Sequence, residues 1–410
     1  MAPKTVRSIR LFGLLVAQLC AYSMLSALCF ACPLYLFDCS GSSTLYGAVA
    51  AIAFIPGVLA TPVGGILADR GRHRGVLVVL GIVLMAASLL FIPMKRSLPL
   101  AVVVAAMLCV QYGIQSLLKP MLQIETVRMT GPEKVERATA LVSQITMMSN
   151  ILGPVVGTAV YGCFGIDALC ETAALTFAMS ALLFGGALKQ NASSGMTGDS
   201  TTCSTCRSDF RESIRYLFQN ASLLVVFLLA AILNLALVGL TIGAPVIVAK
   251  HLGMQSSFVG IIEVAMGLGG LVGSGLVGIW PHRFSFKGIC RYVAMISFGV
   301  VPIIVALLSG PDELAFAALA AGSAWVMAWA SITSVEIVSF VQRPAPKELC
   351  GKVLALVYMT LSCATPIGQL TYGFAYDRWA PAAVFSAMLV VLVLMTVLFY
   401  RLKSRSPQTM

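Results

Sequence analysis

The residues best placed to act on a ligand are polar side chains inside apolar segments. Gln111, Gln115, Lys119 and Gln123 recur at four-residue spacing, so on a helix they form one slowly winding polar stripe. A charge at the centre of a bilayer costs about 2.5–3.5 kcal/mol on insertion scales. The stripe therefore indicates either a substrate cavity or polar contacts between helices, with Lys119 reaching the cytoplasmic interface. The cavity is favoured, because four such residues in one line exceed what helix packing requires.

Three other apolar segments carry similar residues. Trp325 lies near the middle of segment 313–340, where an interfacial aromatic belt does not account for it. Aromatic walls suit apolar or cationic ligands. With the stripe above, the predicted cavity residues are Gln18, Tyr22 and Ser26 in segment 9–35, Asn234 and Thr241 in segment 221–249, and Trp325, Trp329 and Thr333 in segment 313–340.

Two carboxylates are candidates for proton coupling. Glu263 is the most isolated acidic residue in an apolar context. Burial disfavours a charged carboxylate, so proton uptake by Glu263 near neutral pH is feasible; the alternative is an ion pair with Lys250 or another donor. Glu336 lies nearer the predicted cytoplasmic end of its segment, where a structural salt bridge is an equal alternative.

The elements that must position these residues are transmembrane helices. Apolar residues make up 59% of the chain and charged residues 10%, and the mean hydropathy of +0.94 leaves too little polar surface for a soluble protein. Helices satisfy their own backbone polar groups in lipid, and alternating β patterns are absent from the sequence. We predict an all-α membrane protein with twelve spans of roughly 20 residues: 9–35, 44–68, 76–94, 99–126, 138–164, 168–188, 221–249, 257–280, 289–309, 313–340, 352–376 and 381–402.

Basic residues orient the chain, because they collect in short cytoplasmic loops. With both termini in the cytoplasm, only four of the 27 Lys and Arg residues fall outside: Lys95, Arg96, Lys250 and Arg378. The formal charge of +11 is thus explained by topology and gives no reason to invoke nucleic acid. The first apolar segment is too long for a signal peptide and is interpreted as a membrane helix.

Cysteine and histidine do not indicate a cofactor. Cys39, Cys163 and Cys170 fall on the predicted outer side and could pair. The motif Cys203-Ser-Thr-Cys206 has no second cysteine pair and no histidine close to it in the sequence, so it falls short of a zinc site. Without a nucleotide cradle or a cluster of metal ligands, the sequence predicts no enzyme, no metal and no cofactor.

The chain contains an internal repeat. Gly65, Ile66, Arg70, Arg74 and Gly75 match Gly278, Ile279, Arg283, Lys287 and Gly288, and similar pairs include Pro33 with Pro245, Gly153 with Gly368 and Tyr161 with Tyr376. The offset drifts by only a few residues across six helices, which predicts two parallel six-helix halves. We expect halves at 1–188 and 219–410, joined by a cytoplasmic linker at 189–218 that ends in a short amphipathic helix.

The chain resembles the major facilitator superfamily over essentially its whole length. The likeness lies in Gly65-Ile-Leu-Ala-Asp69-Arg70 with Arg72 and Arg74, in Pro132-Glu133 with Arg137 and its repeat Lys347-Glu348 with Gly351-Lys352, and in Gly153-Pro154-Val-Val-Gly157. The last is similar to a motif of proton-coupled antiporters, although Ala140, Ser149 and Thr158 stand where that motif has glycine. All three residues are small, so close helix packing is preserved.

This resemblance implies roles for several residues. Helices 1, 4, 7 and 10 of the superfamily line a central cavity, which agrees with the stripes found by spacing. Glu125, Asp69 and Arg70 would form a charge network that closes the cavity to the cytoplasm, with Gly65, Arg74 and Arg128 beside it; the alternative is a solvated loop. The stretch from Phe210 to Gly270 resembles the macrolide-efflux and siderophore-exporter branch, which implies a bacterial inner-membrane protein.

The sequence thus predicts a secondary active transporter that exports a bulky, partly apolar small molecule in exchange for protons, with Na⁺ as an alternative ion. We expect a monomer in the lipid bilayer, with no nucleic-acid partner. Import or facilitated diffusion of a nutrient is the second interpretation. A membrane sensor that transports nothing is the third.

Overall fold

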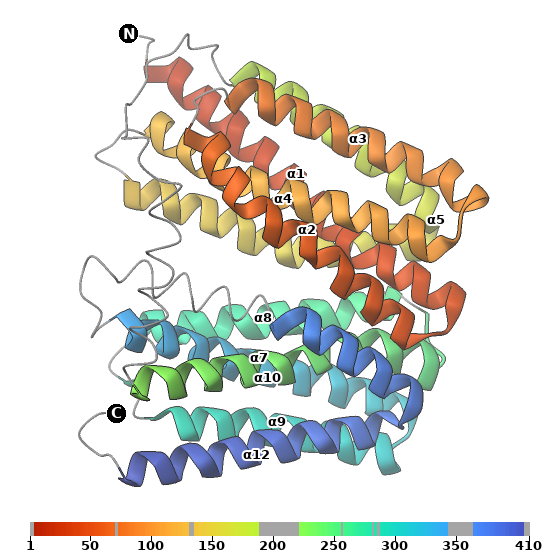
Figure 1. Cartoon of the computed structure of the whole chain (residues 1–410), viewed down its shortest axis with the longest axis vertical. Helices are drawn as coiled ribbons and strands as arrows, with labels where there is room; N and C mark the ends of the chain where they lie inside the picture. Colours follow the sequence, from red (N-terminus) through yellow and green to blue (C-terminus); the bar gives the residue numbers. More distant parts are fainter. Residues whose placement is uncertain are drawn as a thin grey trace. The chain divides into compact units, whose positions relative to one another are not determined.

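Helices joined by short turns make up the part of the protein that the computed structural model describes, which comprises residues 4–69, 73–130, 135–187, 221–255, 257–280, 283–284, 288–342 and 364–405. Ten of its helices are long and apolar enough to cross a membrane. Their bounds are α1 Lys4–Ser40, α2 Ser43–Asp69, α3 His73–Ser97, α4 Leu100–Thr130, α5 Val135–Ala187, α7 Ala221–Val246, α8 Ser257–Ile279, α9 Ile289–Ser309, α10 Asp312–Gln342 and α12 Pro381–Arg405 (Figure 1).

Two further features complete the helical pattern. Gly165 interrupts α5 with φ of 84° and ψ of 175°, a backbone conformation that glycine adopts without strain. This break falls between the predicted segments 138–164 and 168–188. Residues 364–378 are helical as well, so the described residues contain helix in each of the twelve predicted ranges, and the all-α membrane fold is confirmed.

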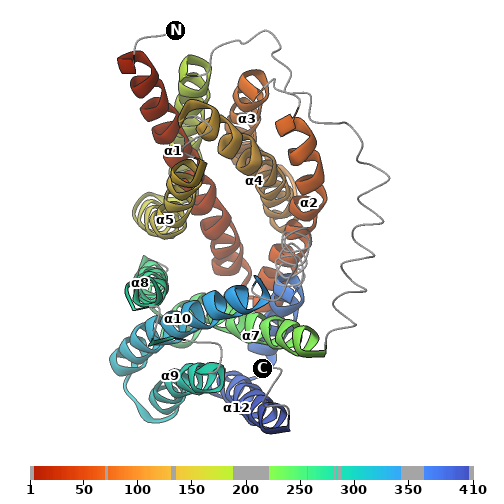
Figure 2. The ribbon, with the colours of Figure 1, turned by 90° about the vertical axis from the view of Figure 1, so that its left-hand side faces the viewer.

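The chain divides into two compact units. Unit 1 comprises 1–196 and 255–263, and unit 2 comprises 197–254 and 264–410. In unit 1, α1 and α3 pack against α5, and α2 packs along α4 (Figure 2). In unit 2, α9 packs against both α10 and α12. The predicted linker at 189–218 lies outside the described residues.

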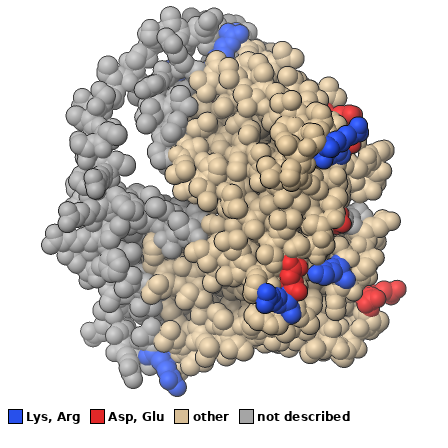
Figure 3. Space-filling view, turned by 45° about the vertical axis from the view of Figure 1, so that its right-hand side comes forward, with Lys and Arg blue, Asp and Glu red and all other residues tan. Residues whose placement is uncertain are grey.

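Large apolar side chains are exposed on the described helices. Leu175, Leu182, Phe298 and Leu308 are all more than two-thirds exposed, and most of the face in Figure 3 is neither basic nor acidic. In water such a surface would drive association, whereas lipid tails cover it at no hydrophobic cost. The exposed apolar residues therefore fit a protein surrounded by a bilayer.

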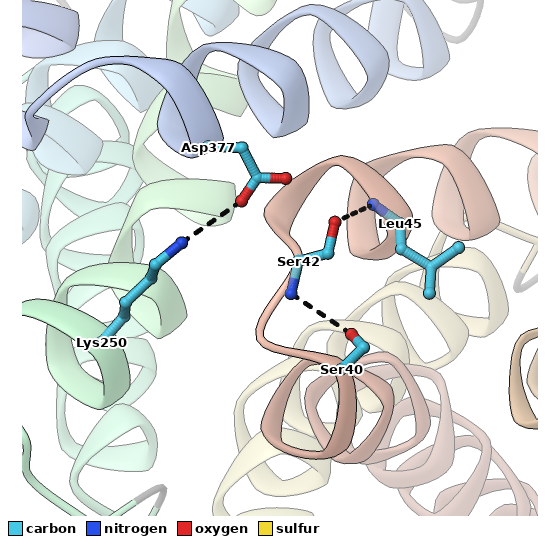
Figure 4. Close-up of polar contacts among 5 residues, drawn as sticks. All are labelled: Ser40, Ser42, Leu45, Lys250 and Asp377. Carbon is cyan, nitrogen blue, oxygen red and sulfur yellow. Dashed lines mark hydrogen bonds and ion pairs between the residues drawn. The ribbon is translucent and has the colours of Figure 1, made fainter.

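The turn from α1 to α2 shows how the helix ends are satisfied. Gly41, with φ of 64°, follows the last residue of α1 and donates its N–H to the Phe37 carbonyl at 2.8 Å, which is a left-handed helix stop. Ser42 then accepts the Leu45 N–H on its Oγ at 3.2 Å, and its own N–H reaches Ser40 Oγ at 3.3 Å (Figure 4). The side chain of Ser42 thus caps the start of α2.

The repeat pairs make equivalent contacts in the two units. A Cβ at Gly153 would collide with Ser26 of α1, and a Cβ at Gly368, its repeat partner, would lie 2.9 Å from Val238 Cβ of α7. One helical turn away the sizes are exchanged, because Gly157 faces Ala27 in unit 1 whereas Tyr372 faces Gly239 in unit 2. Each unit thus keeps one small residue at this crossing, which allows close helix packing.

The polar contacts at the ends of these crossings also correspond. Tyr161 Oη donates to Asp38 Oδ2 at 2.7 Å and joins α5 to α1. In unit 2, the Lys250 ammonium in η2 (Ile247–His251) lies 3.4 Å from Asp377 Oδ1 (Figure 4). Asp38 and Lys250 are separated by the same repeat offset as Pro33 and Pro245. The corresponding contact is therefore a hydrogen bond in unit 1 and an ion pair in unit 2.

Candidate functional site

A buried polar seam lies between α1 and α4 and consists of Gln18, Tyr22, Cys29 and Gln111. The Cys29 thiol donates to Gln111 Oε1 at 3.2 Å and joins the two helices. Gln18 and Tyr22 lie eleven and seven residues before Cys29, which at 3.6 residues per turn places them on the same face of α1. Gln18 and Gln111 are fully buried, and Tyr22 is 2% exposed. Three predicted cavity residues therefore belong to one buried region of unit 1.

The polar atoms of this seam are left without protein partners. Both amide atoms of Gln18, the Tyr22 hydroxyl and Gln111 Nε2 have no hydrogen bond to any residue that the structure describes. A buried polar group without a partner costs about 1–3 kcal/mol, so folded proteins normally supply one. A ligand with hydrogen-bonding groups, or water in its place, would satisfy these atoms.

The rest of the α4 stripe leaves this face gradually. Gln115 and Gln123 are partly buried and Lys119 is exposed. The stripe winds towards the side of α4 that packs on α2, where Gly57 approaches Tyr112 and Ser116. Lys119 has no ion-pair partner within the described part of the chain. Its exposure fits both the cavity and the interfacial interpretation, so its role stays a prediction.

Helix α5 contacts α1 next to the seam, through the antiporter-like segment. Gly153 approaches Ser26, and Gly157 lies so close to Ala27 that an added Cβ would be 2.7 Å from the Ala27 carbonyl oxygen. Gly153, Pro154 and Gly157 are all buried. One turn earlier, Ser23 Oγ donates to Ser149 Oγ at 3.3 Å. Ser26, a predicted cavity residue, thus lies at the α1–α5 contact.

In unit 2 the predicted aromatic wall packs against α9. Trp325 donates its Nε1–H to the Met295 carbonyl at 2.8 Å, and its ring centroid lies 6.1 Å from that of Trp329. Trp329 in turn stacks on Tyr292 at 5.9 Å. These contacts favour a packing role for both tryptophans, and their place in a substrate cavity stays a prediction. The sequence interpretation missed Tyr292, which is 1% exposed.

The remaining predicted residues of unit 2 are distributed over α7 and α10. Thr333 is fully buried and donates to the Trp329 carbonyl one turn back at 2.7 Å. Thr241 donates to the Val238 carbonyl at 3.0 Å, and Asn234 is partly buried. Both threonine hydroxyls are used within their own helices, so neither needs a ligand.

The two candidate carboxylates differ in their surroundings. Glu336 on α10 is 5% exposed and interacts with other groups, which suits the salt-bridge alternative. Glu263, in the second turn of α8, is partly buried and has no hydrogen bond or ion pair to another described residue. Lys250, its suggested partner, forms an ion pair with Asp377 (Figure 4). Glu263 is therefore the carboxylate with fewer competing interactions.

The predicted cytoplasmic gate lies only partly within the described residues. Glu125 is 8% exposed and accepts from Arg128 Nη1 at 3.0 Å, one turn further along α4. Gly65 and Asp69 fall in the last turns of α2, and Arg74 is exposed in the first turn of α3. Arg70 and the side chain of Asp69 lie outside the described residues, so the charge network between these helices stays a prediction.

One component of the seam was missed at the level of sequence. Cys29 and Cys32 form a CxxC pair on α1, and the sequence interpretation treated both as packing residues. The signal that points to Cys29 is its seven-residue spacing from Tyr22, which places a polar thiol on the polar face of α1. The three predicted outer-side cysteines, Cys39, Cys163 and Cys170, are all free in the structure.

Comparisons with known proteins agree with this architecture. The Major Facilitator Superfamily profile matches residues 14–365. The chain belongs to the major facilitator superfamily. It is therefore a multi-pass membrane transporter of the secondary type and not an enzyme, and its cargo is a small molecule. No curated protein sequence matches the chain.

Solved structures share the superfamily fold at low sequence identity. A bacterial homologue of the human lysosomal transporter Spinster, in an inward-facing unoccupied state, has a TM-score of 0.75 at 13% identity and covers 99% of this chain and 98% of its own. A nucleoside transporter has a TM-score of 0.72 at 14% identity, with 96% and 98% covered. A bacterial homologue of the iron transporter ferroportin has a TM-score of 0.70 at 14% identity, with 98% and 99% covered. At these identities the likeness extends to the fold alone.

Proposed function

We propose that this superfamily member exports a bulky, partly apolar small molecule in exchange for protons, by alternating access between two six-helix halves. The observation that supports this most strongly is the α1–α5 crossing. Gly153 and Gly157 of the antiporter-like segment contact α1 at Ser26 and Ala27, beside the face that carries Gln18 and Tyr22. A shift of α5 would therefore be transmitted to the helix that is proposed to hold the substrate.

Proton coupling is assigned first to Glu263 and second to Glu336 or Lys119. Glu263 lies in an apolar helix without a described ion-pair partner, so its charge is compensated poorly and protonation would relieve the cost of burial. Glu263 would take up a proton from the outside and release it to the cytoplasm, which would return the transporter to its starting conformation after each export step. Asp69, Arg70, Arg74, Glu125 and Arg128 are proposed to stabilise the cytoplasmic closure.

The cellular setting follows from the same proposal. The likeness of 210–270 to the macrolide-efflux and siderophore-exporter branch supports a drug-like or siderophore-like cargo and a place in the bacterial inner membrane. The distribution of Lys and Arg supports cytoplasmic termini. We further propose a monomer with halves at 1–188 and 219–410.

The cargo can be found in cells that lack their own efflux pumps. Expression of the chain should lower the accumulation of an exported compound and raise resistance to it. Greater sensitivity would support import instead, and an unchanged flux for every compound in the panel would favour a sensor.

The coupling is then tested with purified protein in proteoliposomes and a compound found in that screen. Replacing Glu263 with Gln should abolish proton-driven uphill movement while leaving downhill exchange of the compound intact. Glu313→Gln, the same chemical change at an exposed position of α10, should behave as the unmodified protein does. Unchanged uphill export by the Glu263→Gln protein would remove the assignment of Glu263.

A further inference from the structure

The seam between α1 and α4 is formed by neutral groups alone. Its members are the amides of Gln18 and Gln111, the phenol of Tyr22 and the thiol of Cys29. The sequence from 11 to 37 in α1 and from 100 to 118 in α4 contains no Asp, Glu, Lys or Arg. Lys119, the nearest charge on the α4 stripe, is exposed, whereas Gln18, Tyr22 and Gln111 are buried.

The hydrogen-bonding capacity of the seam is mixed. The Gln18 amide offers two N–H donors and an acceptor oxygen, the Tyr22 hydroxyl offers one donor and an acceptor, and Gln111 offers its NH₂ group. Gln111 Oε1 is already used by Cys29. Gln18 and Tyr22 lie one helical turn apart on α1, about 6 Å along the axis. Their donors and acceptors together match a ligand group that both donates and accepts, such as a carboxamide, a lactam or a hydroxyl.

A charged ligand group would fit this seam poorly. Moving an ion out of water is far more costly than moving a neutral amide, and it needs a counter-charge that the seam lacks. The neutral polar atoms can hydrogen-bond an amide or alcohol fully but cannot neutralise an ion. We infer that the α1–α4 seam binds an uncharged, hydrogen-bonding group of the substrate, of the carboxamide or hydroxyl class. This inference rests on the proposed transport function and specifies the chemistry of its cargo.

Three dansyl probes that share one fluorophore test this inference. They carry a neutral carboxamide (dansylglycinamide), a carboxylate (dansylglycine) or an ammonium group (dansylethylenediamine). Binding to the full-length protein in nanodiscs is measured by fluorescence enhancement, without any ion gradient. The carboxamide probe should bind saturably and at least tenfold more tightly than either charged probe.

Two variants locate the binding. Gln18→Leu and the nearly isosteric Tyr22→Phe should each weaken carboxamide binding about 3- to 10-fold, the loss expected for one hydrogen bond. Gln369→Leu is the matched control, because Gln369 Oε1 is likewise without a partner but lies on the helical residues 364–378 of unit 2. It should leave binding unchanged. If Gln18→Leu does not fold, Tyr22→Phe still gives the answer.

A structural role for the Gln18 amide would make Gln18→Leu less stable than the unmodified protein. Since neither amide atom of Gln18 is paired, we expect Gln18→Leu to keep or raise the thermal stability of the ligand-free protein while weakening carboxamide binding. Absence of saturable carboxamide binding, equal binding of a charged probe, or full binding by Tyr22→Phe would overturn the inference. Because no gradient is applied, these outcomes are independent of whether proton-driven export succeeds or fails.

Discussion

Gly157→Ala should destabilise the contact between α1 and α5. The added Cβ would lie 2.7 Å from the Ala27 carbonyl oxygen, 3.1 Å from its Cα and 3.2 Å from its carbonyl carbon. Optimal contacts between non-bonded carbon atoms are about 3.5–4.0 Å, and backbone atoms of a packed helix cannot rotate away. The helices must separate by about half an ångström or more, and overpacking of this kind costs about 1–3 kcal/mol.

Gly113→Ala in α4 provides the matched control. A Cβ at Gly113 meets nothing within 4 Å, so this change adds only the gain in helix propensity, up to about 1 kcal/mol. Gly157→Ala gains the same term, and the difference between the two variants therefore isolates the packing cost. We expect Gly157→Ala to melt several degrees below Gly113→Ala when thermal unfolding is followed in one detergent.

A second-site change sharpens the test. At Gly153 the collision is with the side chain of Ser26 as well as with the Ala27 nitrogen at 2.9 Å, so Ser26→Gly should recover part of the stability lost in Gly153→Ala. It should recover none of that lost in Gly157→Ala, where the contacts are with backbone. Equal melting temperatures for Gly157→Ala and Gly113→Ala would refute the close α1–α5 crossing, and with it the structural basis of the proposed transmission.

Three further variants test other contacts by thermal unfolding and transport. Trp325→Phe removes the 2.8 Å bond to the Met295 carbonyl and should cost about 0.5–1.5 kcal/mol without changing transport; a selective loss of transport would restore Trp325 to the cavity. Tyr376→Phe removes the buried bond to the Gly239 carbonyl at 2.9 Å and should cost a similar amount, which an unchanged melting temperature would contradict. Lys250→Met breaks an exposed ion pair and should cost less than about 1 kcal/mol, so a larger, salt-independent loss would show that the pair is more important than its exposure suggests.

The helices could be predicted because lipid imposes a simple rule. A segment must be long, apolar and internally hydrogen-bonded to cross a bilayer, and each of the twelve predicted ranges contains described helix. The ends were less accurate: α1 was expected at 9–35 and runs Lys4–Ser40. Hydropathy marks the part of a helix in hydrocarbon, whereas the backbone continues as helix beyond it.

The partners of individual side chains could not be predicted in the same way. Trp325 and Gln111 both lie in helices that are apolar nearly all round, so periodicity does not show which neighbour each face meets. The contacts to Met295 and Cys29 depend on helix crossings between distant parts of the chain. The repeat predicted that Gly153 and Gly368 are equivalent, but not that Gly157 and Tyr372 exchange sizes against Ala27 and Gly239.

Proton movement measured during substrate transport tests the proposed exchange most directly. The purified protein is reconstituted in proteoliposomes that contain a pH-sensitive dye, and a compound identified in the accumulation screen is added without a pre-formed pH gradient. Downhill entry of the compound should drive protons outwards and make the lumen alkaline, and Glu263→Gln should abolish this pH change. Compound entry with no pH change, or with acidification of the lumen, would contradict proton antiport.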